Sequence, residues 1–263
     1  MKRIKQKAKN EEVYKVKDVK LKAVENLKIM KVLDESQRPL VSRFFRSKTE
    51  SYTAWENKEH QLIISGRMLD LLMRKGDVGG DIIEFYILKL QKNILKEELK
   101  PDGNPKYKKA VFLSTFAYEE KNVAHYEEKK HLHVCHSLVG DGVDHWTLLD
   151  FDTETAEFSH YNSLASIEEE CRKSDESMRQ RIISAFAQHD AKLPRDEQTT
   201  QPPPYTMHTP SCCQQMGNDC GLHVCYYMKI LLKENMASSP GDDISLKVHE
   251  MRPKMVCKIL LDA

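Results

Sequence analysis

The chain has 263 residues, long enough for one substantial hydrophobic core and an appendage. Hydrophobic residues make up 40% and charged residues 31% of the chain, which is the balance of an ordinary globular protein. No stretch approaches the ~18 consecutive apolar residues of a membrane span. The basic N-terminus is not followed by an apolar block, so we expect neither a membrane span nor a secretory signal peptide.

The seven cysteines have no regular spacing, and their number is odd. Both facts argue against a disulfide framework and favour free thiols in a reducing compartment. We therefore expect the cytoplasm, the nucleus or both, or the inside of a host cell if the protein is a delivered effector.

Basic residues are concentrated at the N-terminus, where residues 1–32 hold eleven Lys or Arg and four acidic residues although the formal net charge of the chain is +1. Residues 1–50 are predicted to be a basic, lysine-rich extension, with helical spacing of apolar residues between Val19 and Met30. A solvated helix or tail is the favoured interpretation, with nuclear import as the alternative. Aromatic residues do not interleave the basic ones, so we do not expect nucleic-acid binding.

The segment from residue 68 to residue 90 predicts two helices joined by a turn. An apolar helix over 68–73 is stopped by Gly76. Gly79 and Gly80 form the turn, and Asp81 is placed to cap a buried helix over 82–90.

The rest of the chain alternates between strand-like and helical patterns. Strands are expected at 110–113, 131–139, 145–151 and 157–161, the last three as an antiparallel meander, with a turn at 140–142. A long amphipathic helix over 166–189, a Pro-, Gln- and Thr-rich loop over 192–211 and two helices at 220–232 and 245–261 follow. This order predicts an α+β fold.

Cys220 is the first candidate for chemistry, because a buried apolar helix is predicted to begin at it. A helix N-terminus offers free amides and the positive end of the macrodipole, both of which lower a thiol pKa. Gly221 allows a close approach of the backbone to a substrate. A lone cysteine at such a place is nevertheless more often an inert buried thiol, and Cys212, Cys213 and Cys225 lie nearby.

A nucleophilic thiol also needs a base and a group that orients the base. His145 begins a predicted strand and is followed by Trp146, which can pack on the imidazole. Asn162 ends the next strand, so a hairpin would bring it to the same end of the sheet as His145. Spacing alone leaves this triad open, because histidine is frequent in the chain, at eleven residues.

Several motifs together resemble the Ulp1 family of cysteine peptidases, which includes the SUMO proteases and the Nedd8-specific protease. They are His145-Trp146, Tyr161-Asn162-Ser163, Gln214-Gln215 and Asp219-Cys220-Gly221, in the order and spacing of the family. Residues 81–86 resemble the early helix of the family, and residues 252–261 resemble its closing helix. The resemblance thus covers about 60–263 and implies a papain-like α+β peptidase domain over 51–263, with the cysteine on a central helix packed against the sheet.

The resemblance also implies roles for individual residues. Cys220 would attack the carbonyl carbon after the C-terminal Gly-Gly of SUMO, Nedd8 or ubiquitin, and His145 would be its base. Gln214, six residues before the cysteine, would donate to the oxyanion. Trp146 would wall the channel for the diglycine tail. The partners would be the modifier and its conjugates, with no cofactor or metal and with the enzyme as a monomer.

The chain departs from the family pattern at two places. Asn162 stands where the family has Asp; it can still accept from the imidazole, so we expect activity with an altered pH profile. Gly79 and Gly80 stand where the family places a roofing Trp, just before the residue matching Asp81. The residues Gly79, Gly80 and Asp81 are therefore expected to contact substrate in a more open channel.

Other readings of the same residues remain. An adenain-like viral protease would keep the triad and cut polyproteins, an effector-type acetyltransferase would carry an acetyl group on the cysteine, and a binding module would hold an inactive site. His131, His133 and Cys135 would share one face of a strand, but ligands to complete a metal site are not evident, and a partly exposed strand is the favoured interpretation.

Overall fold

A computed structural model describes residues 19–98, 110–113, 131–140, 143–190, 205–215, 217–232 and 244–263. The basic residues before position 19, part of the turn expected at 140–142 and the Pro-rich part of the 192–211 loop lie outside these ranges.

The sheet that carries the site has five strands in the order β3-β4-β5-β6-β7. The strands are β3 (Ala110–Leu113), β4 (His131–Gly140), β5 (Val143–Asp152), β6 (Glu157–Tyr161) and β7 (Thr206–His208). The antiparallel meander predicted for β4, β5 and β6 is confirmed. The outer strands β3 and β7 pair in parallel with β4 and β6. Strand β7 occupies a segment that we predicted to be loop; three residues give too short a pattern for prediction.

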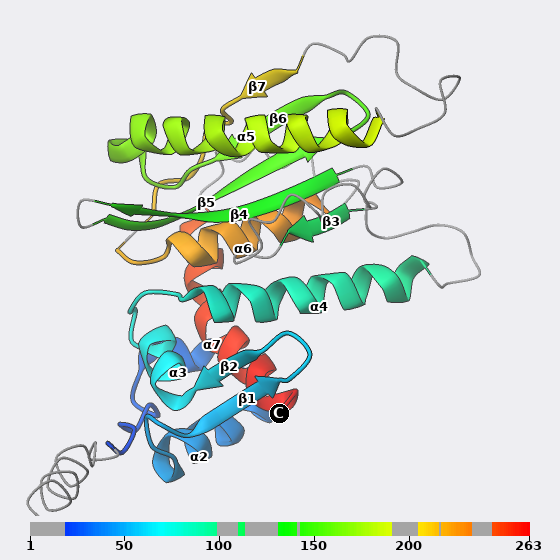
Figure 1. Ribbon diagram of the computed structural model, residues 1–263. Helices are drawn as coiled ribbons and strands as arrows, with labels where there is room; N and C mark the ends of the chain where they lie inside the picture. Colours follow the sequence, from blue (N-terminus) through cyan, green and yellow to red (C-terminus); the bar gives the residue numbers. More distant parts are fainter. Residues whose placement is uncertain are drawn as a thin grey trace, which may run out of the picture.

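Helices cover both faces of this sheet (Figure 1). The long helix α5 (Glu168–Asp190) lies on one face, after the short 3-10 helix η3 (Ala165–Ile167), and packs on a cluster that contains Phe151, Phe158 and Ile182. The helix α6 (Cys220–Leu231) lies on the opposite face and is buried almost throughout. Because α4 (Gly80–Glu98) lies against the other side of α6, the central helix is almost entirely buried, and Lys229 is its exposed residue.

A second group of elements packs below α4 in Figure 1. It contains the two-stranded sheet of β1 (Thr53–Asn57) and β2 (Leu62–Ser65), which our strand predictions missed, together with α3 (Gly66–Met73) and α7 (Ser245–Leu261). The 3-10 helix η1 (Lys28–Val32) and α2 (Gln37–Ser47) complete it. The predicted helices at 68–73, 220–232 and 245–261 are confirmed within two residues at each end.

The prediction of a helix between Val19 and Met30 is wrong. This segment runs without regular structure up to η1, and Lys20 forms a β-bridge with Thr49. The Leu21 amide donates to the Lys48 carbonyl at 3.2 Å, so the backbone is bonded to a distant segment. Leu21 and Val24 are nevertheless buried, and they belong to the same core as α4 and α6.

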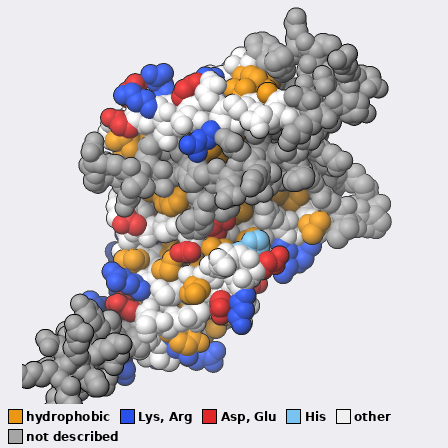
Figure 2. Space-filling view, viewed as in Figure 1, with side chains coloured by type: hydrophobic (Ala, Val, Ile, Leu, Met, Phe, Trp, Pro, Cys, Tyr) orange, Lys and Arg blue, Asp and Glu red, His pale blue; other side chains and the backbone are white. Residues whose placement is uncertain are grey.

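Helix α4 begins earlier and ends later than predicted. Its first residue is Gly80, and the Ile82 amide donates to the Gly79 carbonyl at 3.1 Å. Asp81 therefore lies in the first turn rather than at the cap, a position that also suits an acidic side chain. None of the helices in the described part of the chain is both long and apolar enough to cross a bilayer. Acidic and basic side chains intermingle over the described part of the face in Figure 2.

Candidate active site

Cys220 is the first residue of α6, as predicted, and only 7% of its surface is exposed. The next residue packs unusually closely on the loop before α4. A Cβ atom at Gly221 would lie 2.9 Å from Cβ of Val78 and 3.3 Å from Cδ1 of Ile83. The glycine thus lets the helix start approach that loop, and the loop fixes one side of the Cys220 environment.

The pKa of the Cys220 thiol is raised, against our expectation of a lowered one. Burial is the main cause, and the negative charge of Asp77 adds to it. The backbone amides of Trp146, Gly221 and Cys220 act in the opposite direction, because they donate toward the sulfur. The helix start therefore has the predicted amide donors, but desolvation outweighs them, and the thiol depends on a base for its deprotonation.

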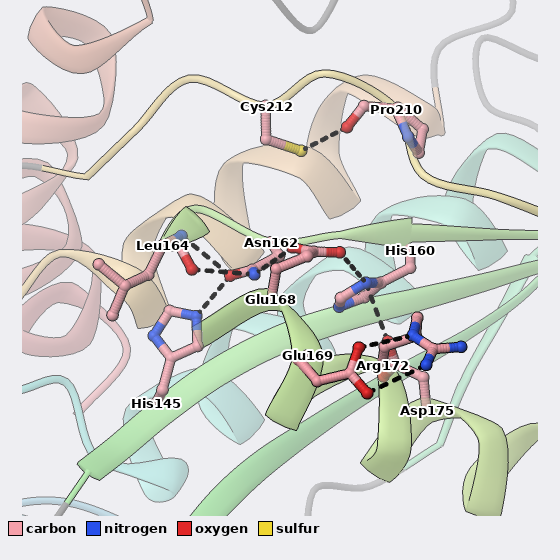
Figure 3. A network of polar contacts seen from close by, with 10 residues as sticks. All are labelled: His145, His160, Asn162, Leu164, Glu168, Glu169, Arg172, Asp175, Pro210 and Cys212. Atoms are coloured by element: carbon pink, nitrogen blue, oxygen red, sulfur yellow. Dashed lines mark hydrogen bonds and ion pairs between the residues drawn. The ribbon is translucent and has the colours of Figure 1, made fainter. Parts of the chain in front are cut away.

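The structure brings the predicted base and its partner together. Nε2 of His145 lies 2.8 Å from Oδ1 of Asn162, and both residues are buried. His145 comes from β5 and Asn162 from the residue after β6, where the antiparallel pairing Leu148 to Tyr161 ends. The hairpin geometry inferred from the sequence thus places both side chains at one end of the sheet, as Figure 3 shows.

The orientation of the Asn162 amide assigns the histidine tautomer. Oδ1 of Asn162 also accepts from the backbone amide of Leu164 at 2.9 Å, while Nδ2 donates to the Leu164 carbonyl at 3.0 Å. The atom facing His145 is therefore an acceptor, so Nε2 of the imidazole carries the proton. That leaves Nδ1 as the unprotonated nitrogen, the state a general base requires.

Two adjacent glutamines anchor the segment before Cys220 to the segment after β6. The exposed Gln214 accepts through Oε1 from the Ala165 amide at 2.8 Å and donates through Nε2 to the Cys212 carbonyl at 3.3 Å. Oε1 of Gln215 accepts from the Ser163 hydroxyl at 2.9 Å, and the backbone amide of Gln215 donates to the Ser163 carbonyl at 2.8 Å. To act as an oxyanion donor, Nε2 of Gln214 thus has to leave the Cys212 carbonyl and donate to the substrate oxygen instead.

Of the residues expected to contact substrate, Trp146 lies next to Cys220. The backbone amide of Trp146 donates toward the Cys220 sulfur, and its half-buried indole packs against the main core. Gly79 and Gly80 follow Val78, which touches the Cys220 turn. Asp81 in the first turn of α4 has a pKa raised by burial. The second tryptophan, Trp55, packs edge-on against Phe85, at a ring-centroid distance of 5.0 Å, in the main core.

A buried arginine that sequence reasoning missed holds the loop immediately before Cys220. Arg252 in α7 is fully buried and forms an ion pair with Asp219, donating from Nε to Oδ1 at 2.9 Å. It also donates to the backbone carbonyls of Leu72, Gly76 and Asn218 at 2.8, 3.1 and 3.0 Å. The signal in the sequence was an arginine inside an apolar helical pattern, a residue type that is rarely buried without a partner.

Of the alternating residues His131, His133 and Cys135 in β4, His133 packs inside the fold. His133 is fully buried, stacks on Phe112 at a centroid distance of 5.0 Å, and lies 3.0 Å from Asp150. The side chains of His131 and Cys135 lie outside the described residues. Among the described residues no group of three His, Cys, Asp or Glu side chains could hold a metal ion.

Comparison with protein families gives a match whose span contains the predicted triad. Residues 138–256 match the model of the Ulp1 protease family, C-terminal catalytic domain. His145, Asn162, Gln214 and Cys220 all lie within that span, whereas Gly79, Gly80 and Asp81 precede it. No curated protein sequence matches the chain significantly.

Solved structures share the fold over most of the chain. The SUMO protease Ulp1 with its catalytic cysteine oxidised to a sulfenic acid is 18% identical, with a TM-score of 0.60, covering 88% of this chain and 96% of that one. The C-terminal Ulp1 protease domain in complex with Smt3, the yeast ortholog of SUMO, is 17% identical with a TM-score of 0.60, again covering 88% of this chain and 96% of that one. The Ulp1-like SUMO protease catalytic domain of Chaetomium thermophilum is 13% identical with a TM-score of 0.59, covering 88% of this chain and 90% of that one.

The predicted fold class is thereby confirmed, with a central cysteine-bearing helix packed against a mixed sheet as in the Ulp1-type, papain-like α+β fold. The family match agrees with the motifs read from the sequence. Residues 138–256, which hold the predicted triad, match the Ulp1 protease family of cysteine peptidases, and the chain shares the fold of the Ulp1 SUMO protease structures.

Proposed function

We propose that the chain removes or matures a ubiquitin-like modifier by cleaving after its C-terminal Gly-Gly. The observation that supports this is the arrangement around Cys220. The thiol lies at a helix start beside the amide of Trp146, and His145, the residue before Trp146, is 2.8 Å from Asn162. Base, orienting amide and thiol are thus held by three separate elements, β5, the end of β6 and α6.

The proposed reaction begins with a protonated Cys220 thiol, whose pKa is raised, and with the unprotonated Nδ1 of His145. Nδ1 of His145 accepts the thiol proton as sulfur attacks the carbonyl carbon of the last glycine. The proton then passes to the leaving lysine amine as the C–N bond breaks and a thioester remains. Water, deprotonated by His145, hydrolyses that thioester and releases the modifier. Gln214 and the Cys220 backbone amide are the proposed oxyanion donors.

The modifier is proposed to be of the SUMO type. The Ulp1 domain solved with Smt3 has the same fold, and the family match covers the segment that carries the triad. The described cysteines are free thiols, which supports a reducing compartment as the place of action.

A panel of C-terminal reporters of SUMO, Nedd8 and ubiquitin tests the proposal. We expect hydrolysis of at least one reporter, strongest for SUMO, and loss of about 10³-fold or more for Cys220→Ser and for His145→Ala. A vinyl-sulfone SUMO probe should form a covalent adduct with the wild type and fail with Cys220→Ser.

The same panel separates the rival activities. Cleavage of short diglycine peptides without any modifier reporter would favour a polyprotein protease. Transfer of labelled acetyl from acetyl-CoA to Cys220 would favour an acetyltransferase. A folded wild type that neither turns over a reporter nor reacts with the probe would contradict the proposed function.

A further inference from the structure

The Asn162 amide has a carboxylate behind it. Nδ2 of Asn162, on the side away from His145, donates to Oε2 of Glu168 at 2.6 Å. Glu168 is the first residue of α5 and follows Asn162 by six positions. Figure 3 shows the resulting chain of contacts from the imidazole of His145 through the amide to the carboxylate.

We propose that Glu168 is a positioning residue that supplies, through Asn162, the negative charge that a neutral amide lacks. This inference rests on the proposed roles of His145 and Cys220. An amide nitrogen that donates to a carboxylate forms a charge-assisted bond, which polarises the amide and increases the negative partial charge on its oxygen. That oxygen is the atom 2.8 Å from His145. The imidazolium formed when His145 takes a proton is thereby stabilised.

The carboxylate also opposes the wrong amide orientation. If the Asn162 amide were flipped, its oxygen would face Glu168 and its NH2 group would face the protonated nitrogen of His145. An acceptor would then face an acceptor at Glu168, and a donor would face a donor at His145. The two bonds to Leu164 favour the same orientation as Glu168 does, so the charge rather than the orientation alone is the distinctive contribution of Glu168.

Glu168 has few other ionisable neighbours. His160 from β6 lies 3.8 Å from its other oxygen, and Asp175 is 2.9 Å from that same histidine nitrogen. The negative charge of Glu168 also contributes to the raised pKa of Cys171 on α5 and of Cys212 on the segment before α6, after the larger effect of burial. The Glu168 side chain is 40% exposed, so solvent screens the charge and its effect is moderate.

Substitution of Glu168 by glutamine tests the charge while keeping an acceptor toward Asn162. We expect Glu168→Gln to lower kcat on the SUMO reporter about three- to tenfold at unchanged KM. The pH midpoint of Cys220 alkylation by iodoacetamide, followed by peptide mass spectrometry, should rise by about 0.5 to 1 unit. The matched control is Glu169→Gln, because Glu169 is the next residue of the same helix and pairs with Arg172 at the surface.

The double variant Asn162→Asp/Glu168→Gln exchanges the amide and the carboxylate. Its carboxylate would contact His145 directly, so we expect kcat and the alkylation midpoint to return to within about twofold and 0.3 unit of the wild type. The proposal is overturned if Glu168→Gln is silent in both measurements, if Glu169→Gln has the same effect, or if the double variant is as impaired as Glu168→Gln. The alkylation midpoint requires no substrate, so it tests Glu168 even if every modifier reporter fails.

Discussion

The thiol of Cys220 illustrates how opposing local effects set the reactivity of one residue. Burial and Asp77 raise its pKa, while three backbone amides lower it, and the net shift is upward. A helix N-terminus alone therefore does not produce a standing thiolate here. In the proposed mechanism activation comes from His145, whose Nδ1 is left unprotonated by the contact of Nε2 with Asn162.

Removal of the imidazole is therefore expected to expose the raised pKa of the thiol. In His145→Ala, the alkylation rate of Cys220 by iodoacetamide should reach half its maximum only above the ordinary thiol pKa of about 8.5. In the wild type the midpoint should lie lower, because the imidazolium stabilises the thiolate. His60→Ala is the control, since His60 is exposed and lies on the loop between β1 and β2. Coinciding midpoints for wild type and His145→Ala would show that His145 is not the base.

At the scale of elements, Arg252 joins three segments that the sequence separates widely. From α7 it binds Asp219 and Asn218 before α6 and the carbonyls of Leu72 and Gly76 at the end of α3. The guanidinium donates hydrogen bonds to these carbonyls in the interior, where leaving a polar group unpaired costs free energy. The position of Cys220, one residue after Asp219, thus depends on the closing helix of the chain.

Truncation of this arginine is expected to destabilise the fold strongly. Arg252→Met should lower the free energy of unfolding by about 3–5 kcal/mol, because it leaves the Asp219 carboxylate buried without its partner. Adding Asp219→Asn should recover part of that loss, since the uncompensated charge is then gone. Urea denaturation followed by circular dichroism measures both effects.

The control for Arg252→Met is Lys254→Met on the same helix. Lys254 is half exposed and pairs with Glu250 at the surface, an interaction worth less than about 1 kcal/mol. Equal destabilisation by the two substitutions would mean that the buried ion pair contributes no more than a surface pair.

At the scale of the whole molecule, prediction succeeded where the sequence pattern is local or dense. The meander β4-β5-β6 and the helix starting at Cys220 follow from alternation and from a continuous apolar run. The short β7 and the irregular path of residues 19–27 were not predicted, because each depends on contacts with distant segments. The local hairpin β1-β2 was missed because its strands of five and four residues give too short a pattern.

The candidate site shows the same division. Proximity of His145 and Asn162 followed from hairpin geometry, which antiparallel pairing makes regular. Glu168 and Arg252 could not be inferred, since their contacts depend on how α5 and α7 pack on the rest of the fold. The raised pKa of Cys220 was missed because desolvation depends on the burial of the thiol in the packed fold.

Burial of His223 predicts how the stability of the whole molecule depends on pH. His223 lies one turn after Cys220 with 1% of its surface exposed, and burial lowers its pKa from 6.5 to about 4; Asp219 opposes this shift, and electrostatic interaction with His145 adds to it. Between these two values the unfolded chain holds the proton that the folded chain does not. The free energy of unfolding therefore falls as pH drops from about 6.5 to about 4, by up to about 1.4 kcal/mol per unit, and this contribution is complete above pH 6.5.

Replacement of this histidine by an uncharged residue should flatten that dependence. In urea denaturation at pH 7, 6, 5 and 4.5, we expect the difference in unfolding free energy between wild type and His223→Gln to shift in favour of the variant as pH falls. The measured quantity is this change with pH rather than the offset at pH 7, which also contains any packing cost of glutamine. His60→Gln, at an exposed position, should follow the wild-type curve in parallel. Parallel curves for His223→Gln and the wild type between pH 7 and 4.5 would mean that His223 is protonated equally in the folded and unfolded chain.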